Sequence, residues 1–245
     1  MTTPDITFYT VGTPNGVKVS IVLEELGIPY KVREISFQKN EQKEPWFLKI
    51  NPNGKIPAII DHSRGDFNVF ESGAIMIYLC EHYDPEGKLL PKDPNLRSQV
   101  IQWIMFQMGG LGPMQGQSSH FNRYAPEKIP YAIKRYSDET KRLYSVLNDS
   151  LEGKEYLVGN RYTLADAISY PWVRAHFLSG IPSINEFPNL KTWIARIDER
   201  PATQKGLNVP TPDKVKELTD NPEKLEEFTK VAQSAFKFKS VEEEK

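Results

Sequence analysis

Residues 6–35 read ITFYTVGTPNGVKVSIVLEELGIPYKVREI and decide the fold of the first half of the chain. Residues 6–11 are rich in β-branched and aromatic types, which predict a strand. Residues 17–26 carry apolar side chains at helical spacing, and residues 30–35 predict a second strand. Strand, helix and strand within about thirty residues make a βαβ unit.

The turn between the first strand and the helix is the first candidate site. Thr13 is the expected N-cap, Pro14 the first helical residue and Gly27 the residue that ends the helix. Main-chain N–H groups at a helix N-terminus favour anions, thiolates included. In thioredoxin-like folds the reactive sulfur sits at this place, but no cysteine occupies it here. Asn15 and Thr13 could donate hydrogen bonds to the sulfur of a bound molecule; alternatively, both residues only build the turn.

The next fifty residues complete an element order of β-α-β-α-β-β-α by about residue 84. Residues 44–50 predict a short helix, residues 58–61 and 68–70 a pair of strands, and residues 72–83 a helix. The first half therefore predicts a small α/β domain that ends before the proline- and glycine-rich residues 84–94.

Two motifs in this half could hold a peptide-like ligand. Ile56–Pro57 directly precedes a strand, and a cis bond there would expose the main-chain N–H and C=O of Ile56 for β-type pairing. An ordinary trans proline is the alternative. Ser72 is expected to cap the next helix, whose N-terminus also favours a carboxylate, and Glu71 could hold an ammonium. A carboxylate and an ammonium on one carbon atom describe the γ-glutamyl end of glutathione.

Strand signals vanish in the second half. Helices are expected over residues 96–107, 129–151, 164–176 and 188–200, with a break or a kink at 109–113 and one further amphipathic stretch at 222–235. Thr163 and Asp166 form a capping box, which we interpret as structural. This half therefore predicts an all-helical domain.

Composition excludes several classes of protein. The chain has 245 residues with one cysteine, and 31 Lys+Arg face 32 Asp+Glu. A single cysteine, Cys80, rules out an internal disulfide and a cysteine-based zinc site, and the four histidines lack metal-ligand spacing, so no metal is expected. The net charge of −1 gives no case for nucleic acid, and no apolar run is long enough to span a membrane. Since we identify no signal peptide, we expect a cytoplasmic protein.

Taken together, these motifs resemble those of the cytosolic glutathione transferases. The element order, Ile56–Pro57, Glu71–Ser72 and the capping box carry this resemblance, which runs from about residue 5 to residue 206. Three segments are similar to the bacterial nu class and to the fungal class related to the yeast nitrogen-catabolite regulator: TPNGVKVS at 13–20, NPNGKIP at 51–57, and GPMQGQ at 112–117 with His120-Phe121.

The resemblance implies an α/β thioredoxin-like N-terminal domain followed by an all-α C-terminal domain. We place the glutathione-binding domain at residues 1–86, a linker at 87–95, the helical domain at 96–210, and a partly helical extension at 211–245.

The resemblance also implies roles for particular residues. Asn15, with Thr13 beside it, would stabilise the glutathione thiolate. The remaining contacts to glutathione would come from Gln42, Lys55, Ile56, Pro57, Glu71, Ser72 and Arg135. Trp103, Phe106 and Phe121 are candidate walls of an electrophile pocket, although aromatic residues at helical spacing more often belong to a core.

The function that the resemblance implies is that of a glutathione-dependent enzyme, a glutathione transferase or disulfide-bond oxidoreductase. Glutathione would be the co-substrate, and the thiolate would reduce a disulfide or a peroxide or attack a small electrophile. A homodimer is also implied, with no nucleic-acid or membrane partner. The alternative is a non-catalytic ligand-binding or regulatory protein with the same fold.

Overall fold

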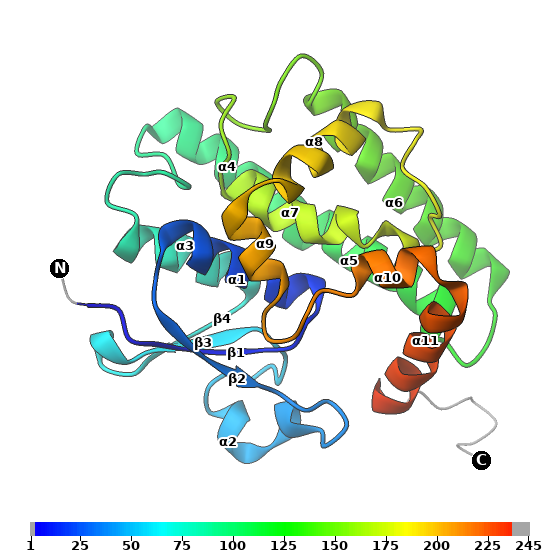
Figure 1. Cartoon of the computed structure of the whole chain (residues 1–245), viewed down its shortest axis with the longest axis horizontal. Helices are drawn as coiled ribbons and strands as arrows, with labels where there is room; N and C mark the ends of the chain where they lie inside the picture. The colour runs from blue at the N-terminus through cyan, green and yellow to red at the C-terminus, as the bar shows by residue number, and fades with distance from the viewer. Residues whose placement is uncertain (1–2, 237–245) are drawn as a thin grey trace.

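The computed structural model describes residues 3–236 and consists of an α/β half followed by an all-helical half (Figure 1). The elements of the first half are β1 (Ile6–Thr10), α1 (Pro14–Leu26), β2 (Tyr30–Glu34), α2 (Pro45–Leu48), β3 (Ala58–Asp61), β4 (Phe67–Phe70) and α3 (Ser72–Tyr83). The predicted order β-α-β-α-β-β-α is confirmed. The strands form one mixed sheet in the order β2-β1-β3-β4, in which only β1 and β2 run parallel.

The two faces of the sheet carry different helices because side chains alternate along each strand. Ile6 and Phe8 of β1 are buried in the main core beneath α1 and α3, whereas Tyr9 packs on a smaller cluster with Phe47 of α2. Figure 1 shows α2 on the opposite side of the sheet from α1 and α3. The segments that follow β1 and precede β3 contribute residues to the cavity described below.

The second half contains α4 (Pro94–Phe106), α5 (Gly112–Ser119), α6 (Pro130–Ser150), α7 (Leu164–Arg174), α8 (Pro188–Asp198), α9 (Pro201–Leu207), α10 (Val215–Asp220) and α11 (Pro222–Phe236). The four predicted helices are confirmed to within a few residues, while α5, α9 and α10 were not predicted. No helix of residues 3–236 combines the length and apolar character that crossing a bilayer requires.

Of the break or kink predicted at residues 109–113, the break is wrong. A π-helical turn, Gln107–Leu111, joins α4 directly to α5, and such a turn distorts the regular helix at this place. Pro113 lies in the first turn of α5, where its ring is tolerated. The second and third predicted helix ends also shift slightly, as α6 ends at Ser150 and α7 at Arg174.

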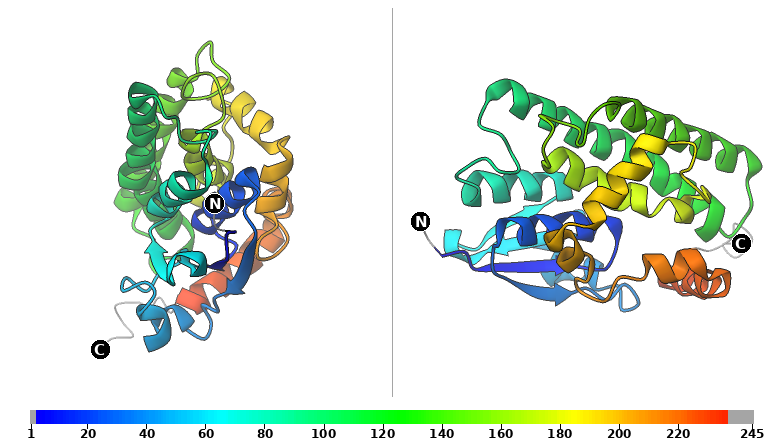
Figure 2. Two further views of the ribbon diagram at one scale, coloured as in Figure 1. Left: turned by 90° about the vertical axis from the view of Figure 1, so that its left-hand side faces the viewer. Right: turned by 45° about the horizontal axis from the view of Figure 1, so that its top comes forward.

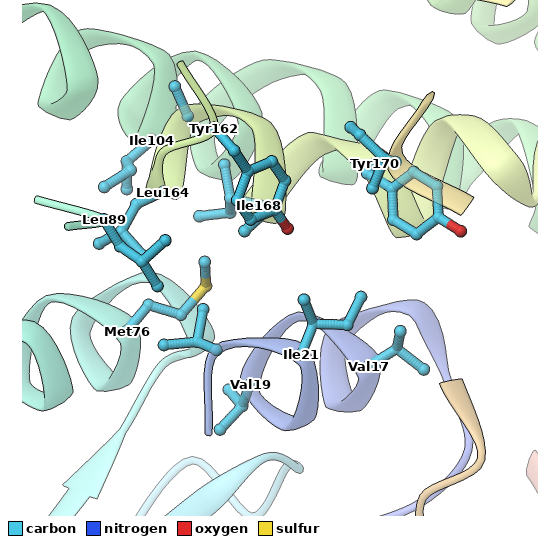
Figure 3. Close-up of a cluster of buried hydrophobic side chains, with 14 of the residues drawn as sticks. Val17, Val19, Ile21, Met76, Leu89, Ile104, Tyr162, Leu164, Ile168 and Tyr170 are labelled. Atoms are coloured by element: carbon cyan, nitrogen blue, oxygen red, sulfur yellow. The ribbon is translucent and has the colours of Figure 1, made fainter. Parts of the chain in front are cut away.

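One hydrophobic core joins the two halves, with α1 in the middle. Val17 and Ile21 of α1 lie opposite Ile168 and Tyr170 of α7 (Figure 3). Figure 2 shows the same layering, with the helical half on one side of α1 and the sheet on the other. Leu89 is fully buried within the predicted linker. The domain boundaries stay a prediction, because both halves share this core.

Two groups of hydrogen bonds stabilise the helical half. The capping box of α7 is confirmed: Thr163 N donates to Asp166 Oδ2 at 3.0 Å, and the Nε1 of Trp193 donates to Asp166 Oδ1 at 2.9 Å. The segment after α9 is held by Arg174, which makes two hydrogen bonds to Asp213 at 2.9 and 2.6 Å. The last nine residues of the predicted extension, 237–245, lie outside the described residues.

Candidate functional site

A cavity of about 400 Å³ lies between the two halves and falls in the size range of small-molecule sites. Four segments line it: the start of α1, the loop before β3, the start of α3, and the helical half. The lining residues are Asn15, Lys18, Asn51, Asn53, Lys55, Ile56, Pro57, Glu71, Ser72, Gln107, Met108, Gly112, Pro113, Gly116, Gln117 and Trp172.

Asn15 reaches the cavity from the first turn of α1. The predicted capping is confirmed: Thr13 is the N-cap, its Oγ1 accepts a hydrogen bond from Gly16 N at 3.4 Å, and Pro14 follows at the first position. Gly16 allows the helix to start directly behind β1, because a Cβ there would lie 2.3 Å from Thr10 Oγ1 and 2.4 Å from the Val11 carbonyl oxygen. The N-terminus of α1 is thus fixed against the sheet, and Asn15 is presented to the cavity.

The loop before β3 presents a peptide edge. Asn51 is buried and shapes this loop, with its Nδ2 donating to the Lys55 carbonyl at 2.6 Å and its Oδ1 accepting from Asn53 N at 3.0 Å. The Ile56–Pro57 bond is cis. Ile56, Pro57 and Lys55, three of the residues predicted to contact the ligand, line the cavity.

The start of α3 differs by one residue from the prediction. Glu71, not Ser72, is the N-cap, and it makes no side-chain capping bond. Glu71 adopts φ 71°, in the left-handed region that side chains rarely enter, at a typical cost of about 1–3 kcal/mol. Ser72 is the first helical residue and is buried at the floor of the cavity. Both residues therefore meet at a helix N-terminus, which favours a carboxylate.

Lys18 places a buried amino group under the cavity. Its side chain is 1% exposed, and its Nζ donates to Gln107 Oε1 at 2.6 Å and Ser72 Oγ at 3.3 Å. Burial holds the pKa of Lys18 well below its usual range, and the Glu71 carboxylate opposes this shift. Because the hydrogen-bond acceptors of Lys18 are neutral, an anion bound in the cavity would favour the protonated form of Lys18.

Several predicted site residues lie elsewhere. Thr13 caps α1 and is not part of the cavity lining. Gln42 lies beside the loop, where its Nε2 donates to Asn40 Oδ1 at 2.9 Å. Arg135 is exposed on α6 and also lies outside the lining.

The three predicted pocket aromatics do not line the cavity either. Trp103 and Phe106 of α4 pack edge to face at 5.2 Å against the main core. Phe121 stacks on Tyr136 at 5.6 Å. The described cavity wall on the helical side is instead made by Met108, Pro113 and Trp172, with small residues between them.

Sequence reasoning missed Lys18, Gln107, Met108 and Trp172. One signal was present: Lys18 lies within GVKVSIVL, an otherwise small or apolar run in which a charge predicts a special role. Gln107 and Trp172 reach the cavity only through the packing of α4 and α7, which no local pattern reveals.

Comparison with known proteins defines the class. A family model described as the glutathione S-transferase N-terminal domain matches residues 4–81, and the corresponding C-terminal domain model matches residues 119–201. The chain therefore belongs to the glutathione transferase family, so the fold and the enzyme class expected from the resemblance are confirmed.

Individual relatives show which members of the family this chain is similar to. The chain is 45% identical over 206 residues to the disulfide-bond oxidoreductase YfcG of Escherichia coli, covering 82% of this chain and 94% of YfcG. It is 34% identical over 229 residues to protein URE2 of Candida albicans, covering 79% of this chain and 67% of URE2. A glutathione transferase homolog from Lodderomyces elongisporus, crystallised with two glutathione molecules per subunit, superposes with a TM-score of 0.79 at 42% identity, covering 84% of this chain and 99% of that one.

Proposed function

We propose that the cavity binds glutathione and that the Asn15 amide, at the N-terminus of α1, stabilises its thiolate. The observation that carries this proposal is the place of Asn15 in the cavity of a chain whose one cysteine is buried. Cys80 is 3% exposed, and burial raises the pKa of its thiol, with the nearby Asp84 acting in the same direction. The reactive sulfur must therefore come from the bound ligand.

The start of α3 fits the γ-glutamyl unit of glutathione. Its carboxylate would accept hydrogen bonds from the Ser72 hydroxyl and the first N–H groups of α3, and its ammonium would lie beside Glu71. The carboxylate would also favour the protonated form of Lys18, whose Nζ already donates to Ser72 Oγ. The Ile56 main chain would pair with the cysteinyl unit in β fashion.

We assign the binding of the glycyl end of glutathione to Lys55 and Gln42. Arg135 is assigned a further contact with glutathione. Lys55 lines the cavity, Gln42 lies beside the same loop, and Arg135 is exposed on α6. With the cysteinyl sulfur at α1, the glycyl carboxylate extends toward the loop, where the Lys55 ammonium favours it.

A thiolate at α1 is energetically reasonable. A cysteinyl thiol titrates near ~8.5, so it is mostly protonated at neutral pH. A hydrogen bond to a charged acceptor contributes about 1.5–3 kcal/mol, and one pKa unit corresponds to about 1.4 kcal/mol. One bond from Asn15, helped by the helix N-terminus, lowers the thiol pKa by roughly one to two units. The thiolate then becomes a major species without a protein base.

The reaction we assign is disulfide reduction. The glutathione thiolate attacks one sulfur of the substrate, a mixed disulfide forms as the substrate S–S bond breaks, and the departing sulfur takes a proton from water. A second glutathione thiolate attacks the mixed disulfide and releases the product thiol with glutathione disulfide. A relative named disulfide-bond oxidoreductase, and one crystallised with two glutathione molecules per subunit, support this assignment.

The same thiolate would also reduce a hydroperoxide or attack an electrophilic carbon. Such a substrate would lie against Met108, Pro113 and Trp172, the described wall on the helical side. A peroxidase activity, the homodimer and the cytoplasmic location stay predictions.

The decisive experiment removes the Asn15 amide. We expect Asn15→Ala to raise the thiol pKa of bound glutathione by about one unit and to lower turnover of a mixed-disulfide substrate at least tenfold at neutral pH, equivalent to one charged hydrogen bond. Asn95→Ala is the matched control, because Asn95 also follows an N-cap and a proline at the start of a helix, α4, but lies outside the cavity.

Binding of S-methylglutathione, which has no ionisable thiol, separates thiolate stabilisation from affinity. Its affinity should be nearly the same in wild type and Asn15→Ala. Equal turnover and equal thiol pKa in the two proteins would refute the role of Asn15. Kinship to URE2 favours the alternative of a non-catalytic regulator; a wild-type protein that binds glutathione without lowering its thiol pKa or turning over any disulfide would establish that alternative.

A further inference from the structure

A hydrogen bond between the two halves fixes the candidate catalytic amide. The indole Nε1 of Trp172, on α7, donates to Oδ1 of Asn15, on α1, at 2.9 Å. The two residues are 157 positions apart in sequence, and both line the cavity. Trp172 therefore contacts the one side chain on which the proposed thiolate stabilisation depends.

The chemistry of the indole decides which way the amide faces. An indole N–H is only a donor, whereas an asparagine amide has an acceptor oxygen and a donor NH₂ group. The oxygen of Asn15 must therefore face Trp172, and the NH₂ group lies on the other side of the amide. Were the amide reversed, its oxygen would oppose a thiolate and its NH₂ would oppose the indole N–H.

We propose that Trp172 is a positioning residue that holds the Asn15 amide with its NH₂ group toward the thiolate of bound glutathione. This inference rests on the proposed function and deepens it. The α/β half supplies the amide and the helix N-terminus, and the helical half sets the orientation of the amide. The thiolate site is therefore complete only when the two halves are packed together.

Trp172 is itself held in place. The Nε2 of Gln115 donates to the Trp172 carbonyl at 2.6 Å, which ties α7 to α5. The ring lies beside Gly116, where an added Cβ would be at an ordinary contact distance of 3.5 Å from it. The Nζ of Lys18 lies 5.9 Å from the ring centroid. The Gln115 bond fixes the main chain of Trp172, and the bond to Asn15 orients its indole N–H.

The test removes the indole N–H while keeping an aromatic ring. Trp172→Phe should raise the thiol pKa of bound glutathione by about 0.5–1 unit, the equivalent of one neutral hydrogen bond. Turnover at saturating glutathione should fall roughly three- to tenfold near about pH 6.5 and return to within about twofold of wild type near about pH 9, because the thiolate then forms without help. A residue that only supports the fold would lower turnover equally at both pH values.

Trp193→Phe is the matched control. Trp193 also donates an indole N–H, to Asp166, but it is fully buried on α8 away from the cavity. This variant should lose stability and keep the wild-type thiol pKa. The double variant Asn15→Ala/Trp172→Phe should have the thiol pKa of Asn15→Ala alone, because Trp172 acts through Asn15.

The outcomes separate this inference from the function on which it rests. A raised thiol pKa in Asn15→Ala with a wild-type value in Trp172→Phe refutes the role of Trp172 alone. An unchanged thiol pKa in Asn15→Ala refutes both. Should Trp172→Phe fail to fold, the indole N–H resonance of Trp172 in the wild type provides the answer: it must move on Asn15→Ala substitution while that of Trp193 stays, and an unmoved resonance overturns the hydrogen bond.

Discussion

Gly16→Ala tests whether the site depends on how closely α1 approaches β1. Gly16 needs no unusual backbone angle, so alanine is compatible with the helix itself. The obstacle is steric, because the new Cβ would lie 2.4 Å from the Val11 carbonyl oxygen and 2.3 Å from Thr10 Oγ1. The Thr10 side chain could rotate away, but the carbonyl oxygen belongs to the main chain at the end of β1.

The size of the effect follows from these distances. A non-bonded contact of a carbon atom is comfortable at about 3.5 Å, so the start of α1 must retreat by about 1 Å. Overpacking of this kind typically costs about 1–3 kcal/mol. At about 2–4 °C per kcal/mol for a chain of this length, we expect the melting temperature to fall by about 2–12 °C. A displacement of about 1 Å at a catalytic group lowers rates by up to about 100-fold, so disulfide turnover should fall at least tenfold.

Circular dichroism melting and a mixed-disulfide assay measure both consequences. Gly12→Ala is the matched control in the same turn, since its Cβ would meet only the movable Oγ1 of Thr211, at 3.3 Å. We expect this control to stay within about 2 °C and twofold of wild type. If Gly16→Ala behaves like Gly12→Ala, the close approach of α1 to β1 does not position Asn15.

Three further substitutions test other parts of the site and fold. Because burial lowers the pKa of Lys18 from its usual 10.5, the unfolded chain holds a proton just below that pH which the folded protein has lost. Stability therefore rises with pH, and the difference in unfolding free energy between the wild type and Lys18→Met should grow between about pH 7 and pH 9.5 in urea titrations. A difference that stays constant would mean that Lys18 keeps its proton in the folded protein, which would contradict the lowered pKa. Gly206→Ala places a Cβ 2.7 Å from the Ile21 main chain and should lower the unfolding free energy by about 2–4 kcal/mol, while Gly109→Ala, which meets nothing within 4 Å, should not lower it. Glu71→Gln should weaken glutathione binding about tenfold in calorimetry but leave the affinity for an analogue without the α-amino group unchanged; equal losses for both ligands would exclude the ammonium contact.

The parts of the site that local sequence determines were predictable. Thr13, Pro14 and Gly27 encode the ends of α1 through capping, and the strand pattern on either side places Asn15 at the start of the helix. Ile56–Pro57 was singled out because of its place before β3. Such features depend on neighbours within a few residues.

The rest of the site depends on packing between distant segments. Gln107, at the start of the π-helical turn between α4 and α5, reaches Lys18 where the sequence predicted only a break or a kink. Trp172 reaches Asn15 because α7 packs on α1. The N-cap of α3 is Glu71 and not the predicted Ser72. Glu71 adopts a φ of 71°, which the preference for serine at N-caps does not predict. Trp103 and Phe106, assigned to the substrate wall, instead pack partly buried against the main core, which their helical spacing equally allowed.

The central place of α1 has a consequence for how this protein could acquire new substrates. Its flanks are occupied by the sheet, α3, α7 and α9, so a change of shape near the sulfur would propagate through the whole core. Pro113, by contrast, lies in the first turn of α5, on the helical wall of the cavity. Directed evolution libraries aimed at Pro113 should alter substrate preference while leaving the thiolate site intact.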